Sequence, residues 1–563
     1  MTSAPMTAEI LLATGLLTPL AALLACLSAP VRERLWRLLP LVPLPALAAA
    51  LLALYATAAG GPPPALLLAP HGLHLGFVAD RSGAVLLGVA ALLWAAAGLH
   101  AGPMLRTSAQ RGRFTLFWLL TLTGSLGVFV AADLISFYLC YGLVSLAAFG
   151  LIAHDGTAFA RRATALYLLL AILGEIALLL AFALLSAAAP KAGLGIEPLV
   201  ALLAGSPWRG ITLALLLTGF ALKIALVPVH VWMPLAYTAA PFPAAAALSG
   251  AAVKAGVIGL IRFLPFEGGA AGWGELLVVA GLFSAFYGVA LGITQRNAKT
   301  VLAYSSISQM GVIAAATGLA LAAGKAAAIA ILTLYAAHHL LAKGALFLGI
   351  GVAAESARRR GVLVLLPASL VGLGIAGLPL TGGAAAKLAL KPLFDTGTLA
   401  LLAALSSAGS TLLMLHFLVR LGATRADTAS VGSTGGPGMQ RVLAWWAMAL
   451  AALVLPWMLL PVLGLGPWHA SFVAALTPAE LWKALWPLML GATAGAAVWR
   501  WGERLPRVPP GDLLAGLGPL RGMAVAVGAA VESLDARLRR WPVAGVALLL
   551  IAVLLGLGVL VPR

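Results

Sequence analysis

Charged side chains are scarce in this chain, since Asp, Glu, Lys and Arg together make up only 9% of its 563 residues. A soluble globular protein carries about 25%, and here 62% of the residues are hydrophobic. An ordinary soluble protein is therefore excluded. Acids are the scarcest group, with 17 Asp and Glu against 35 Lys and Arg. Because the basic residues gather in short connections between apolar runs, this excess follows the positive-inside rule, and we expect no nucleic-acid partner.

Cysteine is almost absent, and the two cysteines, Cys26 and Cys140, both lie in apolar runs. Two isolated cysteines exclude a Cys/His metal site and an iron–sulfur cluster, and they predict no structural disulfide. The sequence also lacks a haem ligation motif and a nucleotide-binding glycine motif in a βαβ setting. We therefore expect no cofactor, no metal and no catalytic residues. The chain is not predicted to be an enzyme by itself.

Long apolar runs are what the chain has instead, and runs of about 20 residues are long enough to cross a bilayer. The sequence predicts an all-α polytopic membrane protein of about 16 spans. These begin near residues 8, 36, 80, 113, 133, 164, 209, 242, 274, 300, 327, 361, 398, 440, 479 and 542. Every second connection is basic, which predicts that those connections are cytoplasmic and that both termini lie on the other side. The segment 501–541 contains VESLDARLRRW and is predicted to form a cytoplasmic amphipathic helix at the membrane surface.

Predicted spans 4–8, which begin near residue 113, and spans 9–13, which begin near residue 274, are candidates for an internal duplication. Their offset is about 160 residues. Lys223 and Lys387 lie in the fourth span of each stretch, next to the helix breakers Pro228 and GLPLTGG at 377–383. An odd number of spans inverts the second repeat, and inverted repeats with broken helices recur in ion-coupled transporters. We predict N-terminal helices 1–3 over 1–112, a first inverted five-helix repeat over 113–263, a second over 264–420, and C-terminal helices 14–16 over 421–563.

Five charged residues fall deep inside predicted spans: Lys223, Lys254, Lys343, Lys387 and Glu175. Each costs about 2.5–3.5 kcal/mol at a helix centre. A single intramembrane lysine is often explained by snorkelling of its ammonium to the interface, but four central lysines argue against a purely structural role. Lysine also suits proton transfer. Removal from water disfavours the ammonium form, so that a buried lysine can exchange a proton near neutral pH, which arginine cannot do.

Other polar side chains favour a hydrated path near these lysines. Imidazoles and hydroxyls can hold water and relay protons, whereas the alternative for the serines is hydrogen bonding between packed helices. Both interpretations stay open. One helix face carries Tyr335, His339 and Lys343 at a spacing of four residues. The further candidates for the proton pathway are His230, Tyr304, Ser308 and His338.

Several ordered motifs over residues 75–420 resemble those of one family, the antiporter-like subunits of respiratory complex I, membrane-bound hydrogenases and Mrp-type Na⁺/H⁺ antiporters. The motifs are FVADRSGAVLL (77–87), LKIALVPVHVWMPLAY (222–237), AALSGAAVKAGVIGLIRF (246–263), RNAKTVLAYSSISQMG (296–311), HHLLAKGALFLGIG (338–351) and GLPLTGGAAAKLAL (377–390). The resemblance implies a line of lysines, histidines and glutamate that carries protons through the middle of the membrane.

The resemblance also implies a role for each matched residue. Lys223 is the broken-helix lysine of the first half-channel, and Lys254 is the connecting lysine of the next span. His339 and Lys343 match the central pair, and Lys387 matches the exit-side residue of the second broken helix. The implied setting is the inner membrane of a bacterium. The implied partners are other integral membrane subunits, a soluble or redox partner on the cytoplasmic side, lipid, and protons, with Na⁺ left open as a coupled ion.

One position departs from the family pattern. The family places a glutamate in the fifth span, paired with the broken-helix lysine, and here the matching stretch DLISFYLCYGLVSL has Gly142 instead. Glu175, one span later, is the one acid deep in a predicted span. Either Glu175 substitutes for the missing glutamate, or the first half-channel is coupled differently.

Three functions remain open. The leading hypothesis is a proton-translocating subunit of a multisubunit membrane complex. The second is the membrane subunit of a proton-driven uptake complex for CO₂ or bicarbonate, whose soluble partner contains zinc. The third is a scaffold subunit that has kept the lysines and no longer conducts.

Overall fold

The computed structural model describes residues 3–68, 75–188, 193–356, 361–394, 397–429, 437–501 and 508–511, and residues up to Pro510 form one compact unit. Helices dominate this part, as expected for a chain that must satisfy every backbone polar group inside a bilayer. The predicted amphipathic segment within 501–541, the last predicted span near 542 and the basic run Arg358–Arg360 lie outside the described residues.

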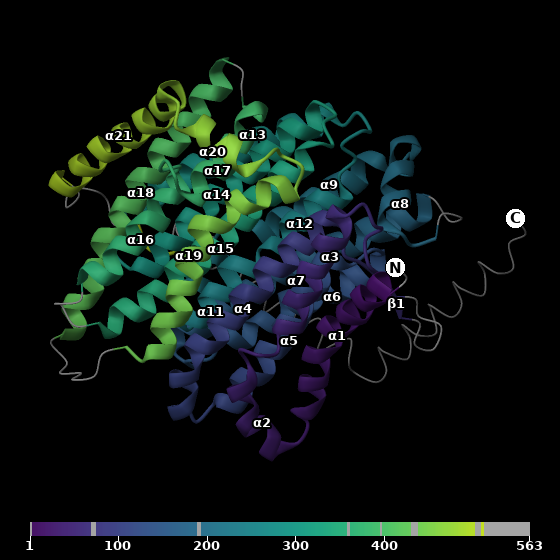
Figure 1. Cartoon of the computed structure of the whole chain (residues 1–563), viewed down its shortest axis with the longest axis horizontal. Coiled ribbons are helices and arrows are strands. Elements are labelled where there is room, and N and C mark those ends of the chain that lie inside the picture. Colours follow the sequence, from purple (N-terminus) through teal and green to yellow (C-terminus); the bar gives the residue numbers. More distant parts are fainter. Residues whose placement is uncertain are drawn as a thin grey trace, which may run out of the picture. The chain divides into compact units, whose positions relative to one another are not determined.

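The described part of the unit before the first helix break, between α9 and α10, contains nine α-helices and a two-stranded antiparallel sheet (Figure 1). The elements up to the first long break are α1 (Ser3–Ala25), α2 (Ala29–Leu35), α3 (Leu44–Ala58), β1 (Ala65–Leu68), β2 (Leu75–Val78), α4 (Arg81–Thr107), α5 (Arg111–Val130), α6 (Leu134–Ile152), α7 (Ala158–Ala188), α8 (Ile196–Leu202) and α9 (Arg209–Ile224). In the sheet, Ala65 pairs with Val78 and Leu68 with Leu75.

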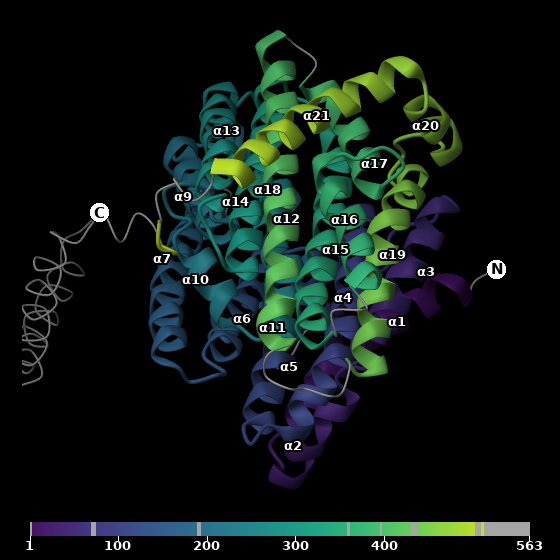
Figure 2. The same cartoon turned by 90° about the vertical axis from the view of Figure 1, so that its left-hand side faces the viewer.

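The remaining elements run from the first break to the C-terminal end of the unit (Figure 2). They are α10 (Trp232–Ala239), α11 (Phe242–Ala247), the π-helical turn Leu248–Ala252, α12 (Lys254–Phe263), α13 (Ala271–Gly292), α14 (Ala298–Ala322), α15 (Ala328–Glu355), α16 (Gly361–Ala376), α17 (Gly382–Leu390), α18 (Gly397–Ala429), α19 (Met439–Val462), α20 (Trp468–Ala475) and α21 (Pro478–Trp501).

Eleven helices among the described residues are long and apolar enough to cross a membrane. They match eleven of the predicted spans, but the total of 16 is not confirmed. The span predicted near residue 36 is a 15-residue helix, α3. The spans predicted near 209 and 361 are each interrupted. The helix predicted to span from 479 is α21, which runs obliquely to the upright helices in Figure 2 and packs its Pro487, Leu488 and Gly491 inward.

The core of the unit lies where the candidate lysines are. In the most apolar stretch of Phe242–Phe263 every residue is buried, and in that of α15 the share is 94%. The corresponding share in α7 is 39%, because one side of α7 presents exposed leucines and isoleucines such as Ile172 and Leu180. A helix that is apolar all round and buried all round is central. The central elements are therefore the ones that carry Lys254, His339 and Lys343.

Basic connections are held together by polar contacts at one end of the helices. Arg111, at the start of α5, pairs with Glu33 of α2 at 2.8 Å. Arg113 donates to the carbonyl of His154, between α6 and α7, at 2.9 Å. Arg441, at the start of α19, pairs with Glu355 at the end of α15. Connections far apart in the sequence thus meet.

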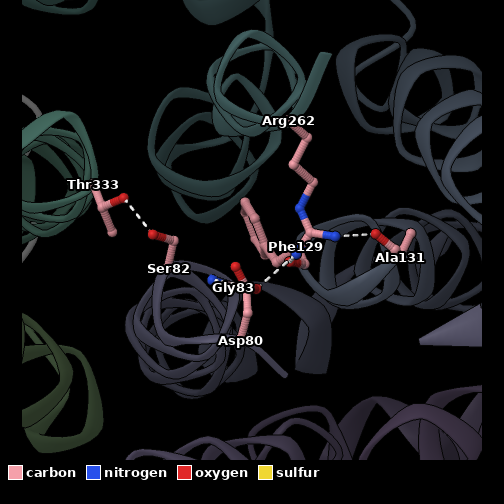
Figure 3. A network of polar contacts seen from close by, with 7 residues as sticks. All are labelled: Asp80, Ser82, Gly83, Phe129, Ala131, Arg262 and Thr333. Atoms are coloured by element: carbon pink, nitrogen blue, oxygen red, sulfur yellow. Dashed lines mark hydrogen bonds and ion pairs between the residues drawn. The ribbon is translucent and has the colours of Figure 1, made fainter. Parts of the chain in front are cut away.

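A second polar network ties α12 to the starts and ends of other helices (Figure 3). Arg262, near the end of α12, donates to Asp80 Oδ1 at 2.9 Å, to the carbonyl of Phe129 at 2.7 Å, and to the carbonyl of Ala131. These two carbonyls lie at the C-terminal end of α5, where carbonyls lack helical partners. Asp80 also caps α4 by accepting from the Gly83 amide. The network fixes the helix on which Lys254 lies.

Candidate functional site

The first helix break begins two residues after Lys223. The chain leaves α9 through Ala225, whose φ of 57° is left-handed, and Pro228 then supplies no amide hydrogen to continue a helix. Neighbouring groups bond the freed backbone, as is required at membrane depth. The amide of Val227 donates to Ser284 Oγ of α13 at 3.0 Å, and the Trp232 indole donates to the carbonyl of Leu222 at 2.9 Å.

Lys223 lies in the last turn of α9 and is buried. Its Nζ donates to Ser145 Oγ of α6 at 2.7 Å and lies 5.4 Å from the ring centre of Tyr141 on the same helix. A cavity of about 20 Å³ adjoins it, with Tyr167 and Trp232 on its wall. Such a cavity holds about one water molecule. The ammonium therefore contacts a hydroxyl and an aromatic face, and the space beside it has room for about one water molecule.

Glu175 of α7 is the only buried acid among the described residues, with 6% of its surface exposed. Lys223 and the Ser145 hydroxyl are close enough to act electrostatically on its carboxyl group. Neither carboxylate oxygen has a hydrogen-bond partner in the described part of the chain, however. The structure thus brings the acid and the lysine into one cluster without a direct bond between them.

Lys254 and His339 form the closest contact between candidate residues. Lys254 Nζ lies 2.7 Å from Nδ1 of His339 on α15, and neither side chain is more than 2% exposed. Lys254 starts α12 directly after the π-helical turn Leu248–Ala252, and such turns are frequent at functional sites. The other ring nitrogen of His339, Nε2, has no partner among the described residues. One turn further along α15, Lys343 Nζ donates to the carbonyl of Leu302 at 2.9 Å.

The second helix break separates α16 from α17. It contains two left-handed residues, Gly377 with φ 99° and Leu380 with φ 67°. Lys387 of α17 reaches back into the break, where its Nζ donates to the carbonyl of Ala376 at 2.7 Å and to Ser407 Oγ of α18 at 2.5 Å. Unlike Lys223, which precedes its break, Lys387 follows its own. In both cases the ammonium meets a serine hydroxyl from a neighbouring helix.

His338 lies between the Lys254–His339 contact and the second break. It is buried, and both of its ring nitrogens lack partners among the described residues. Its Nε2 lies 2.9 Å from the point where a Cβ on Gly383 would be, so the ring faces the start of α17. Lys387 lies about one turn further along α17 than Gly383. His338 therefore lies between His339, its neighbour on α15, and Lys387.

A cavity of about 480 Å³ opens beside Lys387. Most of its wall is apolar, but a polar chain enters it from α15 and α14, where Tyr335 donates to Gln309 Oε1 at 2.7 Å and Gln309 donates to Ser410 Oγ of α18 at 3.0 Å. Glu480 and Lys483 of α21 also line it. Tyr335 lies on the helix face that carries His339 and Lys343, and the structure joins it to Gln309 of α14.

His230, Tyr304 and Ser308 form a separate group beside the first break. The ring of His230 lies edge-on to Tyr287 at 5.0 Å and 6.5 Å from the ring of Tyr304. All three candidates are buried. Tyr304 and Ser308 lie on α14, whereas His230 lies in the first break. The hydrogen bonds described above for Lys254 and Lys343 run to other residues.

Sequence reasoning missed Ser145, Tyr141 and Ser407, which hold the two break lysines. Serines and tyrosines inside apolar helices usually form hydrogen bonds to neighbouring helices. Their residue type therefore does not predict a contact with a buried lysine. The one usable signal is spacing: Tyr141 and Ser145 are four residues apart and flank Gly142, on one face of α6.

Residues 131–413 match the model of a protein family described as "NADH:quinone oxidoreductase/Mrp antiporter, TM". The NADH-quinone oxidoreductase subunit N of Desulforudis audaxviator is 33% identical over 337 residues, which are 56% of this chain and 65% of that protein. The Na⁺/H⁺ antiporter subunit A1 of Staphylococcus aureus is 28% identical over 312 residues, 50% of this chain and 38% of that protein. The chain spans less than two thirds of the length of these relatives.

Solved structures share the fold. A chain of the Mrp complex from Dietzia sp. DQ12-45-1b superposes with a TM-score of 0.69 at 23% identity, covering 99% of this chain and 63% of that one. A chain of the archaeal membrane-bound sulfane sulfur reductase superposes with a TM-score of 0.66 at 21% identity, covering 86% of this chain and 99% of that one. At these identities the likeness concerns the fold alone.

Proposed function

Because the chain belongs to the NADH:quinone oxidoreductase/Mrp antiporter transmembrane family, we propose that it moves protons across the membrane as one subunit of a larger membrane complex. The observation that carries this proposal is the contact between Lys254 Nζ and His339 Nδ1, at 2.7 Å and out of contact with bulk water. Two basic groups gain little stability from meeting in an apolar core. Their contact is explained if one proton is shared between them.

The route begins at Lys223 and ends at Lys387. A proton on Lys254 passes to Nδ1 of His339, which then releases its other proton from Nε2, the ring nitrogen that has no partner among the described residues. Lys343 and His338 receive it in turn, one on the next turn of α15 and one beside the second break. The remaining gaps are bridged by water. Lys387, beside the 480 Å³ cavity, is the exit-side group.

The route requires two half-channels, which we assign to the repeats over 113–263 and 264–420. Each contains a broken helix with a lysine and a left-handed residue at the break, in support of that assignment. We also assign the end of the helices that gathers Arg111, Arg113 and Arg441 to the cytoplasm of a bacterium, by the positive-inside rule. The start of α1 then lies on the other side of the inner membrane, and the same side for the C-terminus stays a prediction.

The partner subunits supply the chemistry. In this proposal the chain itself holds no cofactor and performs no redox step, and a redox or soluble partner drives it from the cytoplasmic side. Relatives named Na⁺/H⁺ antiporter subunits support a test for coupled Na⁺. The alternative of an inorganic-carbon uptake complex stays a prediction, and co-purification with a zinc-containing, carbonic-anhydrase-like protein is its specific sign.

The test uses the full chain in inverted membrane vesicles with its natural partner subunits. Proton flux is followed with a pH-sensitive dye while the complex turns over, with and without Na⁺. We expect Lys254→Ala to lose flux and the exposed control Lys325→Ala to keep it, both with normal assembly. Unchanged flux in Lys254→Ala supports the non-conducting scaffold instead. Flux that requires Na⁺ identifies the coupled ion.

A further inference from the structure

Gly142 of α6 leaves a space that a side chain from another helix fills. A Cβ built on Gly142 would lie 3.6 Å from Oε2 of Glu175, an ordinary van der Waals distance, and no other neighbouring helix in the described part of the chain has an atom within 4 Å of it. The carboxylate of α7 therefore lies where a longer side chain at position 142 would extend.

The side chains around this space are those that hold Lys223. Ser145 lies about one helical turn from Gly142, and its hydroxyl accepts from Lys223 at 2.7 Å. The Ser145 carbonyl accepts from the Tyr167 hydroxyl at 2.6 Å, which ties α6 to α7 at this point. The titratable groups near enough to interact electrostatically with Glu175 are Tyr138 and Tyr141 of α6, Tyr167 of α7 and Lys223 of α9. Lys223 is the only cation among them.

Glu175 lies on the buried face of α7, together with Gly174, Leu178 and Phe182. Residues on the outer side of α7, such as Ile172 and Ile176, are 47% and 49% exposed, whereas Glu175 is 6% exposed. A carboxyl group that turned outward would face lipid, and one buried without a compensating charge is costly. Turning inward toward Lys223 offsets part of that cost, so the position of the acid depends on the lysine.

We propose that Glu175 is the acid partner of Lys223 and has moved from α6 to α7, with Gly142 as the space it now occupies. This inference rests on the proposed function and names the residue that controls proton release from Lys223, where the route begins. While Glu175 is a carboxylate, its charge retains the proton on Lys223, with Ser145 between them. When Glu175 takes up a proton, that charge is gone, and Lys223 releases its own proton toward Lys254.

A reciprocal exchange tests the assignment. Proton flux is measured in vesicles containing the whole complex, for Glu175→Gln and for the double variants Gly142→Glu/Glu175→Gln and Gly142→Gln/Glu175→Gln. We expect Glu175→Gln to lower flux at least about fivefold, since the amide keeps the shape and loses the charge. Gly142→Glu should restore at least half of the loss in the double variant. The neutral Gly142→Gln should restore none.

The outcomes separate this inference from the proposed function. Normal flux in Glu175→Gln together with lost flux in Lys223→Ala overturns the inference and leaves the proposed function standing. Normal flux in both variants sinks the proposed function itself. Equal flux in the two double variants, with normal assembly, also overturns the inference. If the Gly142→Glu double variant does not assemble, Glu175→Asp decides: flux above that of Glu175→Gln supports the assignment, and flux equal to it overturns the assignment.

Discussion

At the first helix break, Lys223 donates to Ser145 in a space with room for about one water molecule. At the second break, Lys387 donates to Ser407 and to the carbonyl of Ala376, on the wall of a cavity of about 480 Å³. Each lysine thus meets one serine from a neighbouring helix. Only Lys387 has a backbone acceptor as well, and only Lys387 has abundant room for water. The two break lysines therefore have different surroundings.

The acids near the two breaks also differ, because one lacks a hydrogen-bond partner and the other is paired. Near Lys223, Glu175 is buried and its oxygens have no hydrogen-bond partner among the described residues. In the second cavity, Glu480 is already paired at 2.9 Å with both Lys391 and Lys483. Because two ammonium groups flank this carboxylate, the three side chains together present no net negative charge to Lys387. The first break has an acid without a hydrogen-bond partner among the described residues and room for about one water molecule, whereas the second has a large cavity and an acid already paired with two lysines.

The largest difference between the breaks is expected on removal of the lysines themselves. We predict that Lys223→Ala lowers proton flux about 100-fold, the usual contribution of a positioned proton-transfer group, because about one water molecule cannot replace it. Lys387→Ala should lower flux by only about tenfold, since water in the cavity can carry part of the flow. Flux in matched vesicles, normalised to the amount of assembled complex, measures both. Equal losses would contradict the comparison.

Removal of the serines should separate the breaks less strongly. Ser145→Ala takes away the one hydrogen bond described for the Lys223 ammonium, and we predict a loss of flux of about fivefold to tenfold. Ser407→Ala leaves Lys387 its bond to the carbonyl of Ala376, so a change of less than about twofold is expected. Threonine at each position keeps the hydroxyl and is the control. A larger loss in Ser407→Ala than in Ser145→Ala would refute the unequal dependence.

Filling the second cavity should have a moderate effect. Ala404 of α18 lines this cavity, and Ala404→Phe replaces water with a ring. We predict a loss of flux of about threefold, because the large volume leaves other water paths. The control is Ala423→Phe, at an exposed position of the same helix. No loss in Ala404→Phe, at normal assembly, would show that water in this cavity is not on the path.

The smallest effect on flux is expected in the network that holds α12. Asp80→Asn keeps a residue suited to cap α4 and removes only the charge that pairs with Arg262. We predict that the free energy of unfolding in nanodiscs falls by about 1 kcal/mol, and that flux stays within about twofold. Asp155→Asn, at an exposed site, is the control. A large loss of flux without loss of stability would give Asp80 a role beyond support.

Some of this arrangement can be predicted from sequence and some cannot. Lysines in apolar runs are costly enough to be noticed one by one, and Pro228 or GLPLTGG mark a break wherever they occur. The starts of most helices follow from apolar length. The serines that hold the lysines carry no such cost. The course of α21 is also hidden, since its apolar residues suit a span as well as a helix packed obliquely on α18, and tertiary contacts decide between the two.

The position of Glu175 shows where the limit lies. Its sequence context, LGEIALLL, predicts burial but not direction, because rotation of α7 by half a turn would point the carboxyl group at lipid. Only the three-dimensional contact with the space at Gly142 identifies its neighbour. The lysines can be predicted alone, but the neighbours of Glu175 are known only from the packing of α6 against α7.

A double-mutant cycle on Lys254 and His339 tests the shared proton route most directly. Flux is measured in vesicles for the wild-type complex, Lys254→Ala, His339→Ala and the double variant, at equal assembly. If one proton passes through the contact between Nζ and Nδ1, the second substitution costs little once the first is made, and the double variant matches the more severe single variant. Losses that simply multiply would mean that the two residues act independently, and unchanged flux in all three variants would contradict the route.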